Sequence, residues 1–479
     1  MRLLVIPARA DPTLETAAPG WTVLDLERAH AERVLDPGRL AAEAAAADVP
    51  GRRRLLLAAA AQLLGAPGAQ TRLRAAGAAY AGTCDEGSGL VLRLDDLELV
   101  CGTTERLDDV LALDAGRSPF APEIDAAVAA ARGAERVVVC LERDQQLPAV
   151  AALVARLAAA GGRPEVAGGF AAAHWAALSS RPPLSAARLV EAPRRERRLA
   201  GLPGLGCEAP LAWRDGPDEP VPGGEWAGRV SLRELAEGTI DLDRCRFAVA
   251  GFCAAHEEVV APDGWRAARE AVRRASCRLV GEWWVGAPGI GRDELERTLA
   301  AEEREPLFDW VAGLRRFHWP AGRRDGAWAG RRVSLLAAPD GLDLAHFQRF
   351  ACPGTIPDGE LDAVLGDLWR RLDARAPVVA GRVAAAFASP QPAAAPGPRV
   401  ELDPDCAVVE LPGEDGRGRW TAVNLRTGVA LAVDARLAPH VAALRRPAAA
   451  DAALGRLPAP ARERALGVLR ARAVIRSCA

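Results

Sequence analysis

The cysteines are the first residues to consider, because thiolates bind metals when their spacing brings several of them together. The chain has ten cysteines among 479 residues, and no two of them form a C-x2-C pair. The closest pair, Cys245 and Cys253, lies in one apolar run, and in a strand these side chains would be about 26 Å apart. One metal ion cannot bind both unless the chain bends between them. We therefore expect most cysteines to be reduced, buried residues without a metal.

Polar residues that follow strands are the second group of candidates. The sequence predicts a strand at 136–141, a helix at 147–160 and a strand at 163–167, which together make one right-handed βαβ unit. Ligands of parallel sheets bind beyond the carboxyl ends of the strands. The predicted ligand contacts are therefore Asp144, Gln145, Gln146, Gly168 and Gly169.

Four regions position these candidates. Residues 1–180 alternate short β-rich runs with Ala/Leu/Arg-rich helical patterns, so we expect an α/β domain with a parallel sheet. Residues 199–388 predict further βα units. A Pro/Ala-rich stretch at 389–398 marks a linker. Residues 399–479 predict a small domain of strands and two helices.

Composition excludes several classes of function. The formal net charge is only −2, and all 61 basic residues are arginine, so we expect neither nucleic acid nor an anionic membrane as a partner. The basic stretch 194–198 lacks interleaved aromatic residues and is interpreted as a solvated linker. The apolar stretch 55–66 is too short to span a bilayer, and residues 3–6 form a strand pattern without a signal peptide. These features predict a cytoplasmic protein.

The segment 122–169 resembles the last part of the cobalamin-binding domain of cobalamin-dependent radical S-adenosylmethionine (radical SAM) methyltransferases. The shared features are a polar loop after the penultimate strand and a Gly-Gly turn. The resemblance implies a Rossmann-like parallel sheet, with cobalamin contacted by Asp144 to Gln146, Gly168 and Gly169. No D-x-H-x-x-G motif is present to supply a lower axial histidine. A flavodoxin-like domain, in which Gly-Gly is a tight turn, is the alternative interpretation.

The next region departs from the same enzymes at their cluster motif. Radical SAM enzymes of this kind carry C-x3-C-x2-C, whose three thiolates bind a four-iron cluster. Counting from Cys207, the second and third positions fall on Leu211 and Arg214, and neither side chain can replace a thiolate. The resemblance therefore implies a degenerate cluster site, with no iron-sulfur cluster and no metal.

Later segments are also similar to these enzymes. A strand, a Gly-x-Pro-Gly turn and a helix within 278–304 resemble a late barrel unit, and too little chain lies between 252 and 281 for a full barrel. We expect an abridged, partial (β/α) barrel. Tryptophan and phenylalanine concentrated at 283–328 are interpreted as core packing, with a substrate groove as the alternative. The segment 231–245 also resembles an uncharacterised family encoded beside such methyltransferases in ribosomal peptide (RiPP) gene clusters.

The C-terminal region resembles the small winged-helix module that holds a precursor peptide as an added strand. Strands are predicted at 406–411 and 420–433, and helices at 435–444 and 460–473. The resemblance implies that Trp420, Asn424 and Gly428 lie at the peptide-binding strands. A plain βα dimerisation domain is the alternative.

Two hypotheses of function follow. The first is a pseudoenzyme: a non-catalytic partner or scaffold that forms a hetero-oligomer with an active radical SAM methyltransferase and binds the precursor peptide. This hypothesis assigns no catalytic residue. The alternative is a methyltransferase that uses bound cobalamin for polar, non-radical methyl transfer.

Overall fold

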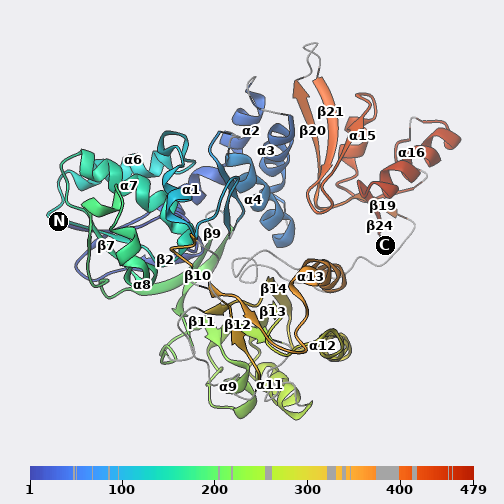
Figure 1. Ribbon diagram of the computed structural model, residues 1–479. Helices are drawn as coiled ribbons and strands as arrows, with labels where there is room; N and C mark the ends of the chain where they lie inside the picture. Colours follow the sequence, from blue (N-terminus) through green and yellow to red (C-terminus); the bar gives the residue numbers. More distant parts are fainter. Residues whose placement is uncertain are drawn as a thin grey trace. The chain divides into compact units, whose positions relative to one another are not determined.

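The computed structural model describes the chain except for residues 47–48, 50, 67, 85–86, 95, 203–204, 217–218, 254–261, 321–330, 337–340, 346, 374–398, 413–417, 451, 456 and 479. The fold belongs to the α/β class, as expected (Figure 1). The chain divides into two compact units. Unit 1 comprises Met1–Ala29, Leu97–Leu202 and Gly206–Ala386, and unit 2 comprises His30–Asp96, Pro203–Leu205 and Phe387–Ala479. The expected linker at 389–398 lies outside the described residues. Among the described helices, none combines the length and the apolar character that crossing a membrane requires.

Unit 1 contains a parallel five-stranded sheet, called sheet A, with the strand order β3-β1-β6-β7-β8. Its strands are β1 (Arg2–Ile6), β3 (Thr22–Asp25), β6 (Arg136–Cys140), β7 (Glu165–Ala167) and β8 (Arg188–Leu189). The short apolar runs expected to be strands are buried, because helices cover a parallel sheet on both faces. The chain order along the sheet reverses between β1 and β6, so the topological switch point lies there.

The predicted βαβ unit is present. The helix between β6 and β7 is α7 (Leu147–Ala159), which is apolar nearly all round and buried along most of its length. The other helical segments of this half of unit 1 are α1 (Leu26–Val34), which continues into unit 2, α5 (Leu107–Leu111), α6 (Ala121–Ala131), α8 (Gly169–Leu178), and the 3₁₀ turns Ala115–Arg117, Asp144–Gln146 and Leu184–Ala186.

A second, seven-stranded sheet, called sheet B, has the order β14-β13-β12-β11-β10-β9-β2. Its strands are β2 (Leu14–Ala17), β9 (Glu196–Leu202), β10 (Leu205–Arg214), β11 (Trp226–Val230), β12 (Cys245–Cys253), β13 (Arg278–Val285) and β14 (Trp310–Arg316). From β10 to β14 each strand pairs in parallel with the next one along the chain. This part of the sheet therefore shows no reversal of order.

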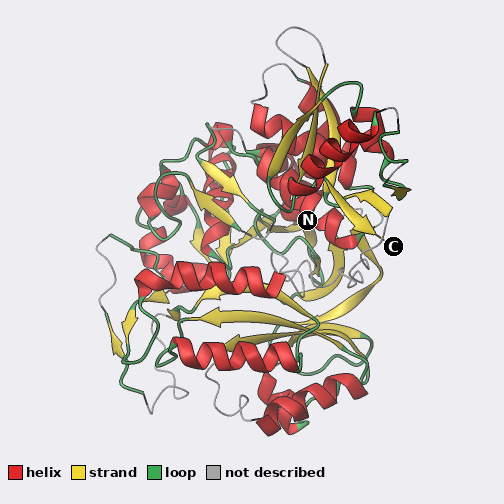
Figure 2. Cartoon of the chain, turned by 90° about the vertical axis from the view of Figure 1, so that its right-hand side faces the viewer, coloured by secondary structure: helices red, strands yellow, loops and turns green. Residues whose placement is uncertain are grey.

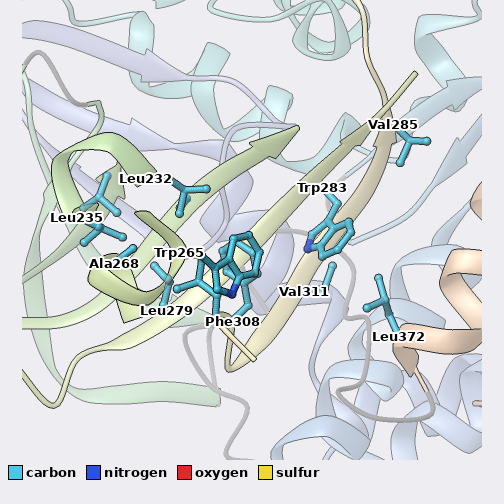
Figure 3. Packing of buried hydrophobic residues seen from close by; sticks show 14 of the residues in the cluster. Leu232, Leu235, Trp265, Ala268, Leu279, Trp283, Val285, Phe308, Val311 and Leu372 are labelled. Atoms are coloured by element: carbon cyan, nitrogen blue, oxygen red, sulfur yellow. The ribbon is translucent and has the colours of Figure 1, made fainter. Parts of the chain in front are cut away.

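The helices that follow these strands pack on sheet B around one apolar core. They are α9 (Leu232–Glu237), α11 (Pro262–Arg274), α12 (Arg292–Arg304) and α13 (Asp358–Asp373), and Figure 2 shows long helices beside the strands. Trp265 and Trp283 both contact the ring of Phe308 edge-on, with centroids 6.1 and 6.4 Å apart (Figure 3). All three side chains are buried, so Trp283 and Phe308, which belong to the aromatic set predicted at 283–328, are part of the core.

Unit 1 also contains four two-residue strands that form two antiparallel pairs, β15 with β17 and β16 with β18. They are β15 (Trp319–Pro320), β16 (Ser334–Leu335), β17 (Phe347–Gln348) and β18 (Phe350–Ala351). One further short strand, β5 (Leu97–Leu99), lies at the start of the second segment of unit 1.

Unit 2 takes nearly all of its residues from two segments that are distant in the sequence, His30–Asp96 and Phe387–Ala479. The first supplies α2 (Pro37–Ala45), α3 (Gly51–Leu63), α4 (Ala69–Thr83) and β4 (Leu90–Leu92). The second supplies β19 (Arg399–Leu402), β20 (Cys406–Pro412), β21 (Gly418–Asn424), β22 (Val429–Val433), α15 (Ala438–Ala443), β23 (Ala448–Ala449), α16 (Ala459–Ala471) and β24 (Ile475–Cys478). The division thus differs from the expected domain 1–180, because the helices at 37–83 pack with β20.

Candidate functional site

The loop after β6 lies at the carboxyl edge of sheet A, and its own hydrogen bonds hold it in place. The side-chain oxygen of Gln146, a buried residue, accepts from the amides of Glu142 and Arg143 at 2.7 and 3.1 Å. Asp144 accepts a hydrogen bond from the hydroxyl of Thr104. The structure thus places Gln146 and Asp144 at the predicted edge, where each makes contacts within the chain.

The Gly-Gly turn lies at the same edge, and Gly169 begins α8. Gly168 has φ +121°, and a Cβ there would meet the Leu141 carbonyl oxygen at 2.5 Å. The Gly169 amide donates to Glu142 Oε2 at 2.8 Å, so a carboxylate of the chain occupies the anion position at the N-terminus of α8. Gly168 therefore permits close approach of two strand ends.

Glu142 is the centre of a charge network at the switch point. Its carboxylate also pairs with Arg195, whose guanidinium lies 3.5 Å from the thiol of Cys140. Burial alone would raise the pKa of Glu142, but the Gly169 amide and Arg195 together hold it below its ordinary value. Burial raises the pKa of the Cys140 thiol to about 11. The carboxylate is therefore ionised and the thiol neutral at physiological pH.

A small hollow opens beside this network, with a volume of about 190 Å³. Its lining includes Asp11, Asp25, Arg195 and Arg197, which come from both sides of the switch point. Burial raises the pKa of Asp25 to about 6, although its carboxylate accepts from the Arg28 amide at 3.0 Å. The hollow is smaller than the roughly 300 Å³ that small-molecule pockets usually reach.

These residues do not fit the corrin that the sequence resemblance implies. The backbone at Gly168 faces the Leu141 carbonyl, and Glu142 already occupies the Gly169 amide. A corrin is also much larger than the hollow. The interpretation of 194–198 as a solvated linker is wrong for Arg195 and Arg197, because ion pairs with Glu142 and Asp215 hold both in place.

The degenerate cluster positions lie on one continuous strand. Cys207, Leu211 and Arg214 are all within β10, and seven residues of strand extend about 23 Å. Because side chains alternate along a strand, Leu211 and Arg214 lie on opposite faces. The side chain of Cys207 is outside the described residues. Three ligands on such a strand cannot converge on one cluster, so the backbone as well as the side chains departs from a cluster site.

Arg214 has a structural role in this strand. It is 3 % exposed and donates to Glu234 Oε1 at 2.9 Å, to the Glu219 carbonyl at 2.8 Å and to the Arg229 carbonyl at 3.0 Å. The adjacent Gly228 has no room for a Cβ, which would meet the Arg214 carbonyl oxygen at 2.4 Å. The arginine therefore joins β10 to β11 and α9.

The turn after β13 is covered by the chain itself. The Gly289 amide donates to the Thr355 hydroxyl at 2.7 Å, and Arg331 donates to the Gly289 carbonyl at 2.9 Å. The Ile356 amide donates to the Ile290 carbonyl at 3.0 Å. These contacts occupy both main-chain groups of Gly289, the last residue of the Gly-x-Pro-Gly turn, at the carboxyl edge of sheet B.

Comparison with known proteins adds no family to this geometry. No protein-family model, curated protein or solved structure matches the chain.

The three residues predicted at a peptide site occupy different positions in the C-terminal sheet. Trp420 is half-buried on the central strand β21 and packs against the core. Asn424 is fully buried: its Oδ1 accepts from the amides of Arg426 and Thr427, and its Nδ2 donates to the Ala473 carbonyl at 2.7 Å. Gly428 has φ +69° and leads directly into β22. Asn424 and Gly428 therefore shape the turn that begins β22.

The two outer strands of this three-stranded antiparallel sheet differ. The order is β20-β21-β22. On β20, both main-chain groups of Val408 are hydrogen-bonded to the side-chain amide of Gln62. The Val408 N–H donates to Gln62 Oε1 at 3.0 Å, and Gln62 Nε2 donates to the Val408 carbonyl oxygen at 3.2 Å. On β22, no strand among the described residues pairs with the outer edge. One edge is thus covered by a side chain, whereas the other has no partner strand within the part of the chain that the structure describes.

The register identifies the open groups. Val408 lies opposite Ala422 on β21. The main-chain N–H and C=O of Val408 point away from β21, toward Gln62, so Val408 and Ala422 form a non-hydrogen-bonded pair. Ala422 must then bond to Leu431 on β22, and the alternation turns the N–H and C=O of Ala430 and Ala432 outward. Both alanines are exposed.

Sequence reasoning missed Gln62, Ala430 and Ala432. The alternation Val-Ala-Leu-Ala-Val of β22 is a signal for an edge strand with a small-residue outer face. No local pattern identifies Gln62, because its partner Val408 is 346 residues away.

Proposed function

We propose that this chain is a non-catalytic partner of a cobalamin-dependent radical SAM methyltransferase and binds the precursor peptide that the active enzyme modifies. The peptide adds as a strand to β22. In this proposal unit 1 is the degenerate relative of the enzyme, and the C-terminal sheet is the winged-helix-like peptide module.

Strand β10 is the observation that carries the proposal. The resemblance to radical SAM enzymes requires three converging thiolates, and the corresponding positions are spread along an extended strand in which Arg214 is a buried structural residue. The consecutive parallel order from β10 to β14 supports the partial-barrel interpretation, because barrel strands pair in chain order. The order of sheet A is that of flavodoxin-like sheets, which supports the interpretation of residues 1–180 as related to a cobalamin domain.

The open edge of β22 supports peptide binding. An extended peptide opposite Ala430 and Ala432 would gain hydrogen bonds to two outward N–H groups and two outward carbonyls. The side chains there are small, so another backbone can approach closely. An edge strand with unpaired groups favours addition of a further strand.

The first experiment tests the non-catalytic assignment. The chain is purified without oxygen, reconstituted with iron and sulfide, and analysed for iron content and for the electron paramagnetic resonance signal of a four-iron cluster. We expect no stoichiometric iron, and no corrin absorbance retained by the chain after cobalamin has been added and the unbound cobalamin removed. A four-iron signal from the chain alone would contradict the proposal.

A pull-down from the source cells tests the partner. We expect a radical SAM methyltransferase, identified by mass spectrometry, to co-purify with the tagged chain. Recovery of the folded chain without any such enzyme would contradict the partner assignment.

Proline substitutions test the peptide edge. A peptide is selected on the full chain from a displayed library of random 20-residue peptides, and its affinity is measured by calorimetry. Ala430→Pro and Ala432→Pro each remove one outward N–H and leave the ladder to β21 intact. We expect each to weaken binding about tenfold or more.

The matched control is Ala430→Ser, which retains the N–H and the small size. We expect wild-type affinity for this variant. Equal affinities for the serine and proline variants would exclude β22 as the binding strand.

A further inference from the structure

Two cysteines that are distant in the sequence meet at the amino edge of sheet B. Cys245 is the first residue of β12, and Cys277 immediately precedes β13. These strands pair in parallel, with Phe247 opposite Arg278. Continued by one residue, this register puts Cys277 opposite Arg246, the neighbour of Cys245. The Cα atoms of the two cysteines are then about 6 Å apart, and a disulfide spans about 4.4–6.8 Å.

The end of α11 turns the side chain of Cys277 into the core. Ser276 has φ +52°, and its amide donates to the Arg273 carbonyl at 3.2 Å. The Cys277 amide donates to the Val272 carbonyl at 3.2 Å. These two bonds form a Schellman motif, which brings the residue after the left-handed position back against the last turn of the helix. Cys277 is accordingly only 6 % exposed, and Cys245 is 3 % exposed.

The two thiols are in hydrogen-bonding contact with each other. This contact and burial raise the pKa of the Cys277 thiol well above its ordinary value, and the nearby carboxylate of Asp309 raises it further. Cys277 is therefore a neutral thiol at physiological pH. Because the thiolate is the nucleophile in disulfide exchange, the reaction of Cys277 should become faster as pH rises.

A hollow of about 500 Å³ opens onto one of these cysteines. Of the pair, Cys277 belongs to its lining, together with Arg269, Arg273 and Arg278. Arg273 and Arg278 are exposed. A reagent that enters the hollow would therefore reach Cys277 first. Three arginines around the entrance favour a reagent that carries carboxylates.

We propose that Cys245 and Cys277 form a reversible disulfide by exchange with an anionic, low-molecular-weight disulfide, RSSR. The Cys277 thiolate attacks one sulfur of RSSR, forms a mixed disulfide and releases RS⁻. The Cys245 thiolate then attacks the sulfur of Cys277 and releases the second RS⁻. The protons of the two cysteines end on the released thiols. The protein thus loses two electrons, and one RSSR is reduced to two RSH.

The new bond would join the first residues of two neighbouring strands and close a loop that contains β12 and α11. A cross-link of this kind restricts the unfolded chain, so the oxidised protein should unfold at a higher urea concentration than the reduced one. The site involves neither β22 nor a bound peptide. The inference therefore does not depend on the proposed function.

Exchange with glutathione disulfide, which carries carboxylates, tests the pair. The reduced full chain is incubated with it without denaturant at about pH 8, where more thiolate is present. Remaining thiols are then blocked with N-ethylmaleimide, and the chain is digested for mass spectrometry. We expect a peptide in which Cys245 and Cys277 are linked, and a higher urea midpoint. Absence of this peptide, or linkage of Cys277 to a different cysteine, would overturn the proposal.

Two serine variants separate the steps. Cys245→Ser should stop at the mixed disulfide, with one glutathione on Cys277. Cys277→Ser should leave Cys245 unmodified, because that thiol does not line the hollow. Urea unfolding of both reduced variants verifies that they fold. Glutathione on Cys245 in Cys277→Ser, with none on Cys277 in Cys245→Ser, would overturn the order of attack.

Arg273→Glu tests the preference for an anionic reagent. The rate of exchange is measured with glutathione disulfide and with cystamine, which is cationic. We expect the ratio of the two rates to fall about threefold or more in this variant. The ratio is independent of any general change in the reactivity of Cys277. An unchanged ratio would overturn the assignment of an anionic reagent.

Discussion

The carboxyl edges of the two sheets of unit 1 and the outer strand β22 of unit 2 present opposite situations. At the edges in unit 1, side chains and backbone of the same chain occupy the polar groups: Glu142 binds the Gly169 amide, and Thr355 binds the Gly289 amide. On β22, the outward groups of Ala430 and Ala432 have no partner strand among the described residues.

This difference indicates where a partner can gain binding energy. A ligand at either edge of unit 1 must first displace hydrogen bonds that the chain already makes, so the net gain is small. A peptide at β22 replaces water. The resemblance of the fold to known enzymes would place a ligand site in unit 1. The outward main-chain groups of Ala430 and Ala432 instead lie on the sheet β20-β21-β22 of unit 2.

The largest effect is expected from Arg214. Arg214→Ala leaves Glu234 and two carbonyls without their donor, and should lower the free energy of unfolding by about 3–5 kcal/mol. Urea denaturation followed by circular dichroism measures this. The control Arg246→Ala removes an exposed pair with Glu225 and should change stability by less than about 1 kcal/mol.

A double variant, Leu211→Cys/Arg214→Cys, tests the same strand by restoring the cysteine triplet. The extended strand should still prevent cluster assembly, so the variant should bind no stoichiometric iron on reconstitution. A four-iron cluster in this variant would show that β10 rearranges and that only the side chains were lost.

Asp405→Ala should give the next largest effect. It removes the acceptor of Thr71 and Arg74 and should destabilise unit 2 by about 2–3 kcal/mol. Hydrogen exchange should show faster exchange in α4 and β20 with unit 1 unchanged. Glu463→Ala, at an exposed position of α16, serves as the control. Unchanged protection of α4 would mean that apolar packing and the Gln62–Val408 hydrogen bonds hold the helices without Asp405.

Asp25→Asn tests the switch-point hollow through pH. Burial raises the pKa of Asp25 from 3.8 to about 6, so ionisation favours the unfolded chain and wild-type stability falls as pH rises from about 4 through 6. Asparagine keeps the acceptor for the Arg28 amide without ionising. The variant should be about 1–2 kcal/mol more stable than the wild type at pH 7.5, and similar to it at pH 4. Equal stability at pH 7.5 would show that Asp25 ionises normally.

Gly428→Ala should give the smallest effect. The residue has φ +69°, and no neighbouring atom lies near the position of a Cβ, so strain of the backbone is the only cost, about 1 kcal/mol. Thermal unfolding should show a small decrease in midpoint. A larger loss would mean that the turn before β22 makes contacts beyond those described.

Local sequence patterns predicted most individual elements. The strand and the helix predicted within 278–304 are present as β13 and α12, and the predicted helix 147–160 differs from α7 by one residue. Their apolar spacing and terminal residues are local properties. Most of the described cysteines are buried and none forms a disulfide, as expected, although Cys101 is exposed.

Long-range pairings could not be predicted in the same way. The hydrogen bonds of Gln62 with Val408 and of Thr71 with Asp405 join positions more than 300 residues apart, and no periodicity within α3 or α4 specifies them. Nor does a count from Cys207 reveal that the positions at 211 and 214 lie on an extended strand. These features can be recognised only from the three-dimensional structure.

The distance in sequence between the two main segments of unit 2 has a consequence during synthesis. Arg74 and Asp405 are separated by 331 residues, and ribosomes add about 5–20 residues per second. Helices α2 to α4 therefore leave the ribosome roughly 15–60 s before β20 exists. Over that interval their apolar surface is available to chaperones, and a transcript cut short before β20 would yield a chain whose first helices never acquire their partner.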